Sequence, residues 1–292
     1  MRAIVGRLVF HANEATPPIE MVAVAKRFVV ISCVGFALAC TPAAQTTNAP
    51  VESALSIPPI ADGGTGTTLG GVRFKRVPAT VGSRWTVSTR AESRATDDQS
   101  SGYDSDYTVE VLAVQGAAPS RVRLRFTRNM NVFREAESAT ILHGNTYVVD
   151  ATAPNVRDSS DAAVSERETE RVLDAYPDIG MRSRIDEVLP EEPMAIGERR
   201  NVLADAILRT MHPRAWKMVT SEATLSRVNG DDAVFSIVIV ADSQASGIHL
   251  DTKGEARIRL RDSRLVALEL EGSYGEGDTK GVFTLRRVVR DD

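Results

Sequence analysis

The chain has 292 residues, of which 42% are hydrophobic and 25% are charged, so it is long and apolar enough to bury a sizeable core. Its formal net charge is −4. This acidic excess argues against a nucleic-acid-binding protein, which needs a basic surface to meet the phosphates.

The first informative element is an apolar run of 12 residues, Phe28–Ala39. Lys26 and Arg27 precede the run and Cys40 follows it, which is the layout of a secretory signal with a positive n-region, a short h-region and a small residue at the cleavage site. The run is too short for a transmembrane helix, which needs about 20 residues. With Cys40 first after the cleavage, the segment resembles a bacterial lipoprotein signal, and this resemblance implies that Cys40 is acylated and becomes the mature N-terminus.

The lipobox departs from the family pattern at one position. The residue three places before the cysteine, usually leucine in lipoproteins, is Ala37 here, and Leu38 stands one place later. The alternative is an ordinary signal cut nearby, which leaves Cys40 as a free thiol. Residues 1–20 contain acidic residues and two adjacent prolines, unlike an n-region, whereas Met21 opens a typical one. We therefore expect Met21 to be the true start, the alternative being an unusually long n-region.

Removal of the signal region, residues 1–39, leaves Cys40 as the only cysteine and lowers the net charge to about −6, because the removed part carries a net +2. A single cysteine excludes an intramolecular disulfide, a zinc site built on cysteines and, once acylated, a cysteine nucleophile. Residues 40–71 are rich in Pro, Thr, Ala and Gly, so they cannot bury enough apolar surface to fold. We expect them to be a flexible tether.

From residue 72 onward the sequence predicts β-strands. Arg121–Phe126 and Arg257–Arg261 alternate basic and apolar residues, which is the pattern of half-buried strands. Other strands are expected at 107–114, 234–240 and 283–289, with a turn at Asn229-Gly230. The run at 234–240 is apolar on nearly both faces, so it should be the most buried strand.

A three-residue turn, 262–264, is expected to join Arg257–Arg261 to a strand at 265–271. This register keeps apolar side chains on one face and charged ones on the other. It sets Leu260 opposite Val266, Ile258 opposite Leu268 and Arg257 opposite Glu269.

One short helix is expected at 165–176, because Ser165 and Glu168 form a capping box and Pro177 ends the apolar stripe. A faint repeat, P-x-x-[VI]-G-x-R-x-x-V, begins at residue 78 and again at residue 193. It suggests two similar β-meanders, at 72–150 and 187–292, with chance resemblance as the alternative. Residues 203–211 have helical propensity, but the repeat alignment predicts a strand at 202–209.

These elements predict a mainly β domain over residues 72–292, built as a curved antiparallel sheet or half-open barrel. In outline this plan resembles the half-open barrels of periplasmic lipoproteins and lipoprotein carriers, and equally uncharacterised exported lipoproteins. Its specific motif is the lipobox, so the resemblance transfers no functional residue except Cys40.

The sequence carries no recognisable catalytic motif. His143, His212 and His249 lack the close spacing of metal ligands. The acidic stretch 97–106 lacks the alternating ligands and the closing glutamate of a calcium loop, so we expect a solvated, mobile loop there. No serine stands in a nucleophile motif. We therefore expect a non-enzymatic protein without metal or cofactor.

Two candidate binding surfaces remain. The first is an anion-binding face of aligned arginines, the alternative being an ordinary solvent face with cross-strand ion pairs. Its residues are Arg121, Arg123, Arg125, Arg257, Arg259 and Arg261. The second is an apolar concave face for an acyl chain or another hydrophobic ligand, the alternative being a filled core. Its residues are Val234, Ile237, Val238, Ile239, Leu260 and Leu268.

The main interpretation is a lipid-anchored protein of the cell envelope that acts as a binding module. The alternatives are a structural or assembly lipoprotein that binds another envelope protein and, third, an envelope hydrolase. The expected partners are the membrane, through the N-terminal lipid, and a lipid or an envelope protein, but no nucleic acid. Thr41, rather than aspartate, follows the cysteine, and by analogy with Gram-negative lipoproteins this favours the outer membrane, facing the periplasm.

Overall fold

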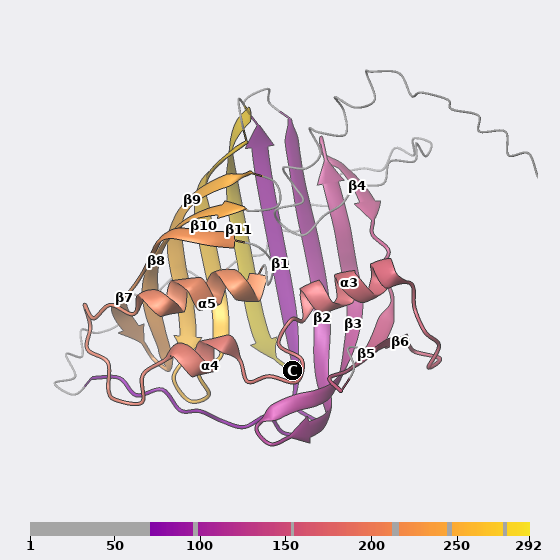
Figure 1. Cartoon of the computed structure of the whole chain (residues 1–292), viewed down its shortest axis with the longest axis horizontal. Coiled ribbons are helices and arrows are strands. Elements are labelled where there is room, and N and C mark those ends of the chain that lie inside the picture. Colours follow the sequence, from indigo (N-terminus) through magenta and orange to yellow (C-terminus); the bar gives the residue numbers. More distant parts are fainter. Residues whose placement is uncertain (1–70, 96–98, 153–154, 212–215, 244–246, 277–278) are drawn as a thin grey trace, which may run out of the picture.

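The computed structural model describes residues 71–95, 99–152, 155–211, 216–243, 247–276 and 279–292. These residues form one curved, eleven-stranded antiparallel sheet with three helices on one of its faces (Figure 1). The predicted mainly β architecture with a curved antiparallel sheet is therefore confirmed. The sheet is not closed into a barrel, because β6 and β7 lie at its opposite ends.

The strands are β1 (Arg84–Ala95), β2 (Ser100–Gln115), β3 (Ala118–Phe133), β4 (Ala136–Ala139), β5 (Thr146–Asp150), β6 (Asn155–Asp158), β7 (Trp216–Asn229), β8 (Asp232–Ser243), β9 (His249–Arg259), β10 (Leu265–Glu276) and β11 (Thr279–Asp291). The helices are α3 (Glu166–Ala175), α4 (Arg184–Val188) and α5 (Asn201–Met211). The predicted signal region, Cys40 and the predicted tether up to residue 70 lie outside the described residues. Within the described part, no helix is both long and apolar enough to span a membrane.

The strand order is β6-β5-β3-β2-β1-β11-β10-β9-β8-β7, with β4 paired to β3. Two meanders therefore meet at the centre, where β1 pairs with β11 along its length. The first runs outward from β1, and the second begins at the far edge with β7 and returns to β11. Each contains a tight hairpin whose turn has a glycine at positive φ, Gly116 and Gly230, a conformation that glycine adopts without strain.

The strand predicted at 202–209 from the repeat is wrong, because this segment lies in α5. Leu203, Ala204, Ile207 and Leu208 are all buried, and their spacing puts them on one face of a helix. Leucine and alanine are also among the best helix formers. Position 87, which the repeat aligned with 202, lies in β1, so the two meanders do not begin alike.

The predicted register of β9 and β10 is also wrong. Leu265 pairs with Ile258 and Ala267 pairs with Arg257, with a bulge between them at Val266. Residues 260–264 form the connection, which is longer than the three residues expected. The three-residue turn was expected because it keeps apolar side chains on one face of the sheet. The bulge has the same effect with the longer connection, since Ile258 and Leu268 are buried in the same core.

The helices cover the concave face over two separate cores. The β7–β11 core, which contains Phe74, Leu203, Ile207 and Phe235, lies under α4 and α5. The β1–β6 core, which contains Val109, Leu124, Phe126, Tyr147 and Val172, lies under α3. Helix α3 begins with the predicted capping box, in which the Ser165 side chain accepts from the Glu168 backbone and the Glu168 carboxylate accepts from the Ser165 backbone.

Glycines allow the sheet to curve where its strands approach most closely. A Cβ atom at Gly254 would lie 1.9 Å from the Glu269 carbonyl oxygen, and one at Gly272 would lie 2.1 Å from that of Asp251. Neither distance is compatible with a side chain, so the strong bend of β9 against β10 requires glycine at both positions.

Candidate functional site

A cavity of about 330 Å³ lies where the two cores meet, on the helix-covered face of the sheet. Strands β1, β2 and β11 form its floor, while the end of α3, the start of α4 and the β9–β10 connection form its walls. Small-molecule sites have about 300–1,000 Å³, so this cavity suits one small molecule and is too small for a complete diacyl lipid. The floor residues are Trp85, Val87, Tyr107, Arg287 and Val289.

Three aromatic side chains line the cavity. The Tyr107 hydroxyl donates to the carbonyl oxygen of Ala175 at 2.8 Å, which ties the floor to the end of α3. Tyr176 follows as the C-cap of that helix, and burial raises the pKa of its hydroxyl. The ring of Trp85 lies 4.3 Å from the Arg264 guanidinium, a cation–π contact. These contacts hold the aromatic lining in a fixed arrangement.

Arg287 is a charged residue between apolar neighbours on the inner face of β11. It pairs with Leu268 and Thr89 on the flanking strands, and Leu285 and Val289 share its face by alternation. Its Nη2 atom donates to the Tyr107 hydroxyl at 3.4 Å, a long hydrogen bond. Its Nε atom is buried and has no hydrogen-bond partner among the described residues. Because the buried Nε is out of reach of a ligand, the donors that Arg287 can offer to the cavity are those of its terminal nitrogens, of which one makes the long bond to Tyr107.

Two carboxylates face the cavity from the helix side. Asp178 pairs with Arg184 at 3.1 Å, yet burial still raises its pKa. Asp186, in α4, has a buried Oδ1 atom without a hydrogen-bond partner among the described residues. Burial raises the pKa of Asp186 to about 6, against the opposing attraction of Arg182 and Arg76.

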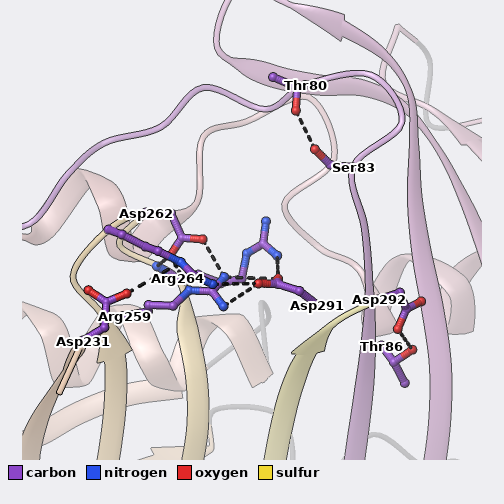
Figure 2. Close-up of polar contacts among 10 residues, drawn as sticks. Thr80, Ser83, Thr86, Asp231, Arg259, Asp262, Arg264, Asp291 and Asp292 are labelled. Atoms are coloured by element: carbon purple, nitrogen blue, oxygen red, sulfur yellow. Dashed lines mark hydrogen bonds and ion pairs between the residues drawn. The ribbon is translucent and has the colours of Figure 1, made fainter. Parts of the chain in front are cut away.

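A charge network borders the cavity beside the β9–β10 connection (Figure 2). Arg259 binds Asp262 through two hydrogen bonds of 2.9 and 2.6 Å and also donates to Asp291 at 2.6 Å. Arg264 and Arg261 reach the same Asp291 carboxylate at 2.9 and 3.2 Å. Hydrogen bonds to Arg259 are the main reason why the pKa of Asp291 is lowered. The C-terminal end of β11 is thereby fixed against the cavity wall.

The exposed part of the lining contains apolar side chains beside the polar Thr80 and Arg182. Val77 and Met181, which come from two separate segments, are exposed by 51% and 42%. Between Thr80 and Ser83 the two hydroxyls are hydrogen-bonded at 2.6 Å, which tightens one of these segments (Figure 2). Exposed apolar side chains at an opening favour the entry of an apolar or amphipathic molecule.

The two predicted arginine rows are not brought together. Arg121, Arg123 and Arg125 are exposed on β3, whereas the second row begins on β9, five strand positions or about 24 Å away along the sheet. Arg123 pairs with Glu110 on the neighbouring strand at 2.7 Å. In the second row, Arg257 lies half-buried in β9, and Arg259 and Arg261 belong to the network beside the cavity.

The predicted apolar lining residues lie outside this cavity. Ile237, Ile239 and Leu268 are fully buried in the β7–β11 core, and Leu260 packs against that core. Val234 and Val238 lie on the opposite face of β8 from Ile237 and Ile239. On that face Val234 is buried and Val238 is half-buried. These positions contribute to packing rather than to the lining of the space described above.

The other sequence candidates lie apart from the cavity. His143 accepts a hydrogen bond from the backbone of Asn129 at 3.2 Å, His249 is hydrogen-bonded to Asp242 at 2.8 Å, and His212 lies outside the described residues. The loop expected at 97–106 is wrong from residue 100 onward, because that part belongs to β2, where Asp104 pairs with Arg128. No group of metal-binding side chains occurs among the residues that the structure describes.

Sequence reasoning missed the residues that form the cavity. One signal was present: Phe283, Leu285, Arg287 and Val289 alternate along one predicted strand, and the arginine interrupts an otherwise apolar face. Asp186 and Asp178 had no such signal, because their position depends on how the 176–188 segment folds back over the sheet.

No family model matches the sequence, and the search of curated proteins found no match either. Among solved structures, the chain is similar to lipovitellin, described by its lipid–protein interactions, at 9% identity and a TM-score of 0.31. That match covers 73% of this chain and 25% of the lipovitellin chain, so this chain spans a quarter of its length. DynF from the dynemicin biosynthesis pathway of Micromonospora chersina matches at 10% identity and a TM-score of 0.19, over 76% of this chain and 95% of DynF. Neither likeness assigns the chain to a family.

Proposed function

We propose that this protein is a lipid-anchored, non-enzymatic binding module of the cell envelope that holds one small molecule between its helices and the centre of its sheet. The main observation in support of this proposal is the cavity of about 330 Å³, which has aromatic and arginine side chains on its floor. Its lining combines charged and hydroxyl side chains with aromatic and aliphatic ones, so it can contact both a polar and an apolar part of a ligand.

The lining supports binding better than catalysis. Several of its hydroxyls are engaged locally, since Ser263 donates to the Lys75 carbonyl oxygen and Thr80 is bonded to Ser83. Neither histidine nor cysteine contributes to the lining among the described residues, and the Asp178 carboxylate is already paired with Arg184.

The anchoring part of the proposal rests on the sequence. If Cys40 carries the lipid, a chain expressed in a Gram-negative host should incorporate radiolabelled palmitate and fractionate with the membrane. A Cys40→Ser chain should do neither. Labelling that persists in the Cys40→Ser chain would refute the anchor.

The binding part is tested by native mass spectrometry of the full-length chain, extracted in mild detergent from the same host. Ser183 lines the cavity and its side chain makes no capping hydrogen bond, so Ser183→Trp fills the space without loss of a cap. We expect a bound small-molecule mass on the native chain and none on the Ser183→Trp variant. An equal bound mass on both proteins would place the ligand elsewhere.

A second candidate function, the binding of another envelope protein, is favoured by one observation. The outer side of β7 is covered at Ala223 and Leu225 by backbone hydrogen bonds from the 197–200 segment. Residues 217–222 have no strand beside them on that side among the described residues. An unpaired edge can accept a strand from a partner. Because Ala223 and Leu225 form their backbone hydrogen bonds outward, alternation directs the N–H of Ser221 to the open edge, so Ser221→Pro should abolish co-purification of such a partner and leave the ligand mass unchanged.

A further inference from the structure

We propose that the ligand of this cavity is an amphipathic organic anion, whose carboxylate, sulfonate or phosphate oxygens accept hydrogen bonds from Arg287 while its apolar body lies against the rim. This inference rests on the proposed binding function and names the chemistry of its ligand. Three observations carry it: the free donors of Arg287, the charge balance of the lining, and the apolar opening.

The first observation is that Arg287 has hydrogen-bonding capacity without a matching acceptor. A guanidinium has five N–H donors in a planar fork that fits carboxylates and phosphates. Here one donor makes the 3.4 Å contact to Tyr107, and the buried Nε has no partner among the described residues. The nearby Asp178 is already hydrogen-bonded to Arg184. A half-buried cation with few hydrogen bonds loses part of its hydration, and an anionic ligand would compensate for that loss.

The second observation concerns the charges that line the cavity, which are Arg182, Arg264, Arg287, Asp178, Asp186 and Asp262. Three of the six are neutralised by ion pairs, since Asp178 binds Arg184, Asp262 binds Arg259 and Arg264 binds Asp291. The remaining charges are two arginines and one aspartate. The lining is therefore net positive, and it becomes more positive whenever Asp186 takes up a proton.

The third observation is the geometry of the opening. Arg287 lies on the floor, in the middle of the sheet, whereas the exposed Val77 and Met181 lie at the rim. A ligand that reaches Arg287 with a charged group must leave its other end against these apolar side chains. The molecule that fits both ends has an anionic head and an aromatic or short aliphatic body.

Two isosteric probes separate charge from shape: 1-naphthalenesulfonate, which is an anion, and 1-naphthalenesulfonamide, which is neutral. Both are titrated by calorimetry into the full-length chain in matched detergent, and the Ser183→Trp variant supplies the background of micelle and surface binding. We expect the sulfonate to bind at least tenfold more tightly than the sulfonamide. Binding of both should disappear in Ser183→Trp.

The decisive comparison uses two neighbouring arginines of β11. Arg287→Met should weaken sulfonate binding at least tenfold and leave sulfonamide binding unchanged. Arg286→Met is the control on the same strand: its Nε is also buried without a hydrogen bond, lies 3.5 Å from the Glu269 carboxylate as an ion pair, and points to the other face of the strand. It should change neither probe. Circular dichroism and the melting temperature confirm that both variants are folded.

The possible failures are distinguishable. Equal affinity for both probes, or an unchanged sulfonate affinity in Arg287→Met, overturns the anionic ligand and leaves the binding function standing. Probe binding that persists in Ser183→Trp, or no binding by the native chain, overturns the proposed function itself.

Discussion

The charge network beside the cavity should contribute much more to stability than an ion pair of equal geometry on the outer face. Arg259 makes two hydrogen bonds to Asp262 and two to Asp291, and its side chain is only 12% exposed. Arg227 makes two hydrogen bonds of 2.7 and 2.9 Å to Glu255, but its side chain is 46% exposed. The two arginines therefore differ mainly in burial and in the number of their partners.

Removal of one partner from a buried ion pair costs about 3–5 kcal/mol, whereas exposed pairs contribute about 0.2–1 kcal/mol. Asp262 and Asp291 are themselves 20% and 41% exposed. The free-energy cost of Arg259→Met should therefore lie at the low end of the range for buried pairs, at about 3 kcal/mol. Arg227→Met should cost less than about 1 kcal/mol. For a domain of this size, the two values correspond to decreases in melting temperature of about 6–12 °C and at most about 4 °C.

The assay is urea unfolding followed by tryptophan fluorescence, because guanidinium chloride would screen the charges under study. Methionine keeps much of the aliphatic volume, so the comparison isolates the guanidinium group. Equal free energies of unfolding for Arg259→Met and Arg227→Met would refute the argument that burial determines the contribution of these pairs.

Three further predictions follow from individual side chains. Burial raises the pKa of Asp186 to about 6, so the folded state prefers the protonated form, and the destabilising contribution of Asp186 should disappear as the pH falls from 7 through 6 towards 4. Asp186→Asn should accordingly be more stable than wild type by about 1 kcal/mol at pH 7.5, allowing for partial exposure, and equally stable near pH 3.5; a constant difference across a pH series of melts would contradict this. Gly272→Ala should destabilise the sheet by about 3 kcal/mol, measured by urea unfolding, since its Cβ would lie 2.1 Å from a backbone oxygen, and a neutral result would contradict the stated reason for the bend. Ser165→Ala should cost about 1 kcal/mol by loss of the α3 cap, and Ser165→Asp should restore it; failure of the aspartate to rescue in thermal melts would count against the cap.

The fold class could be predicted because its signals are local. Alternation in Arg121–Phe126 puts Val122 and Leu124 in the core, and the same pattern identified β9 and β11. The cap at Ser165 identified α3, since it depends on residues three apart. These patterns need no knowledge of what lies across the sheet.

The errors had two different sources: a local pattern that was disregarded, and a strand pairing that distant parts of the chain determine. The strand predicted at 202–209 came from a sequence alignment that ignored the helical spacing of its apolar residues. The bulge at Val266 depends on how β10 pairs with β9 and β11 together, which the hairpin sequence does not reveal.

The candidate site was hidden for the same reason. Its floor comes from β1, β2 and β11, and its wall comes from residues 176–188, so the lining is assembled from segments more than 100 residues apart. Arginines were noticed where they formed rows, although Arg287, which follows apolar residues on its face of β11, is the arginine on the cavity floor. A single charge in an alternating apolar strand was the more informative pattern.

The central claim is that a small anion binds in the cavity between the two cores, and the chain's two tryptophans test it most directly. Trp85 lies on the cavity floor, whereas Trp216 packs against the β7–β11 core at the edge of the sheet. In a ¹⁵N–¹H correlation spectrum, with the indole signals assigned by Trp216→Phe, 1-naphthalenesulfonate should shift the Trp85 signal saturably and leave that of Trp216 in place. A shift of Trp216 alone, or of both signals without saturation, would contradict binding in the cavity.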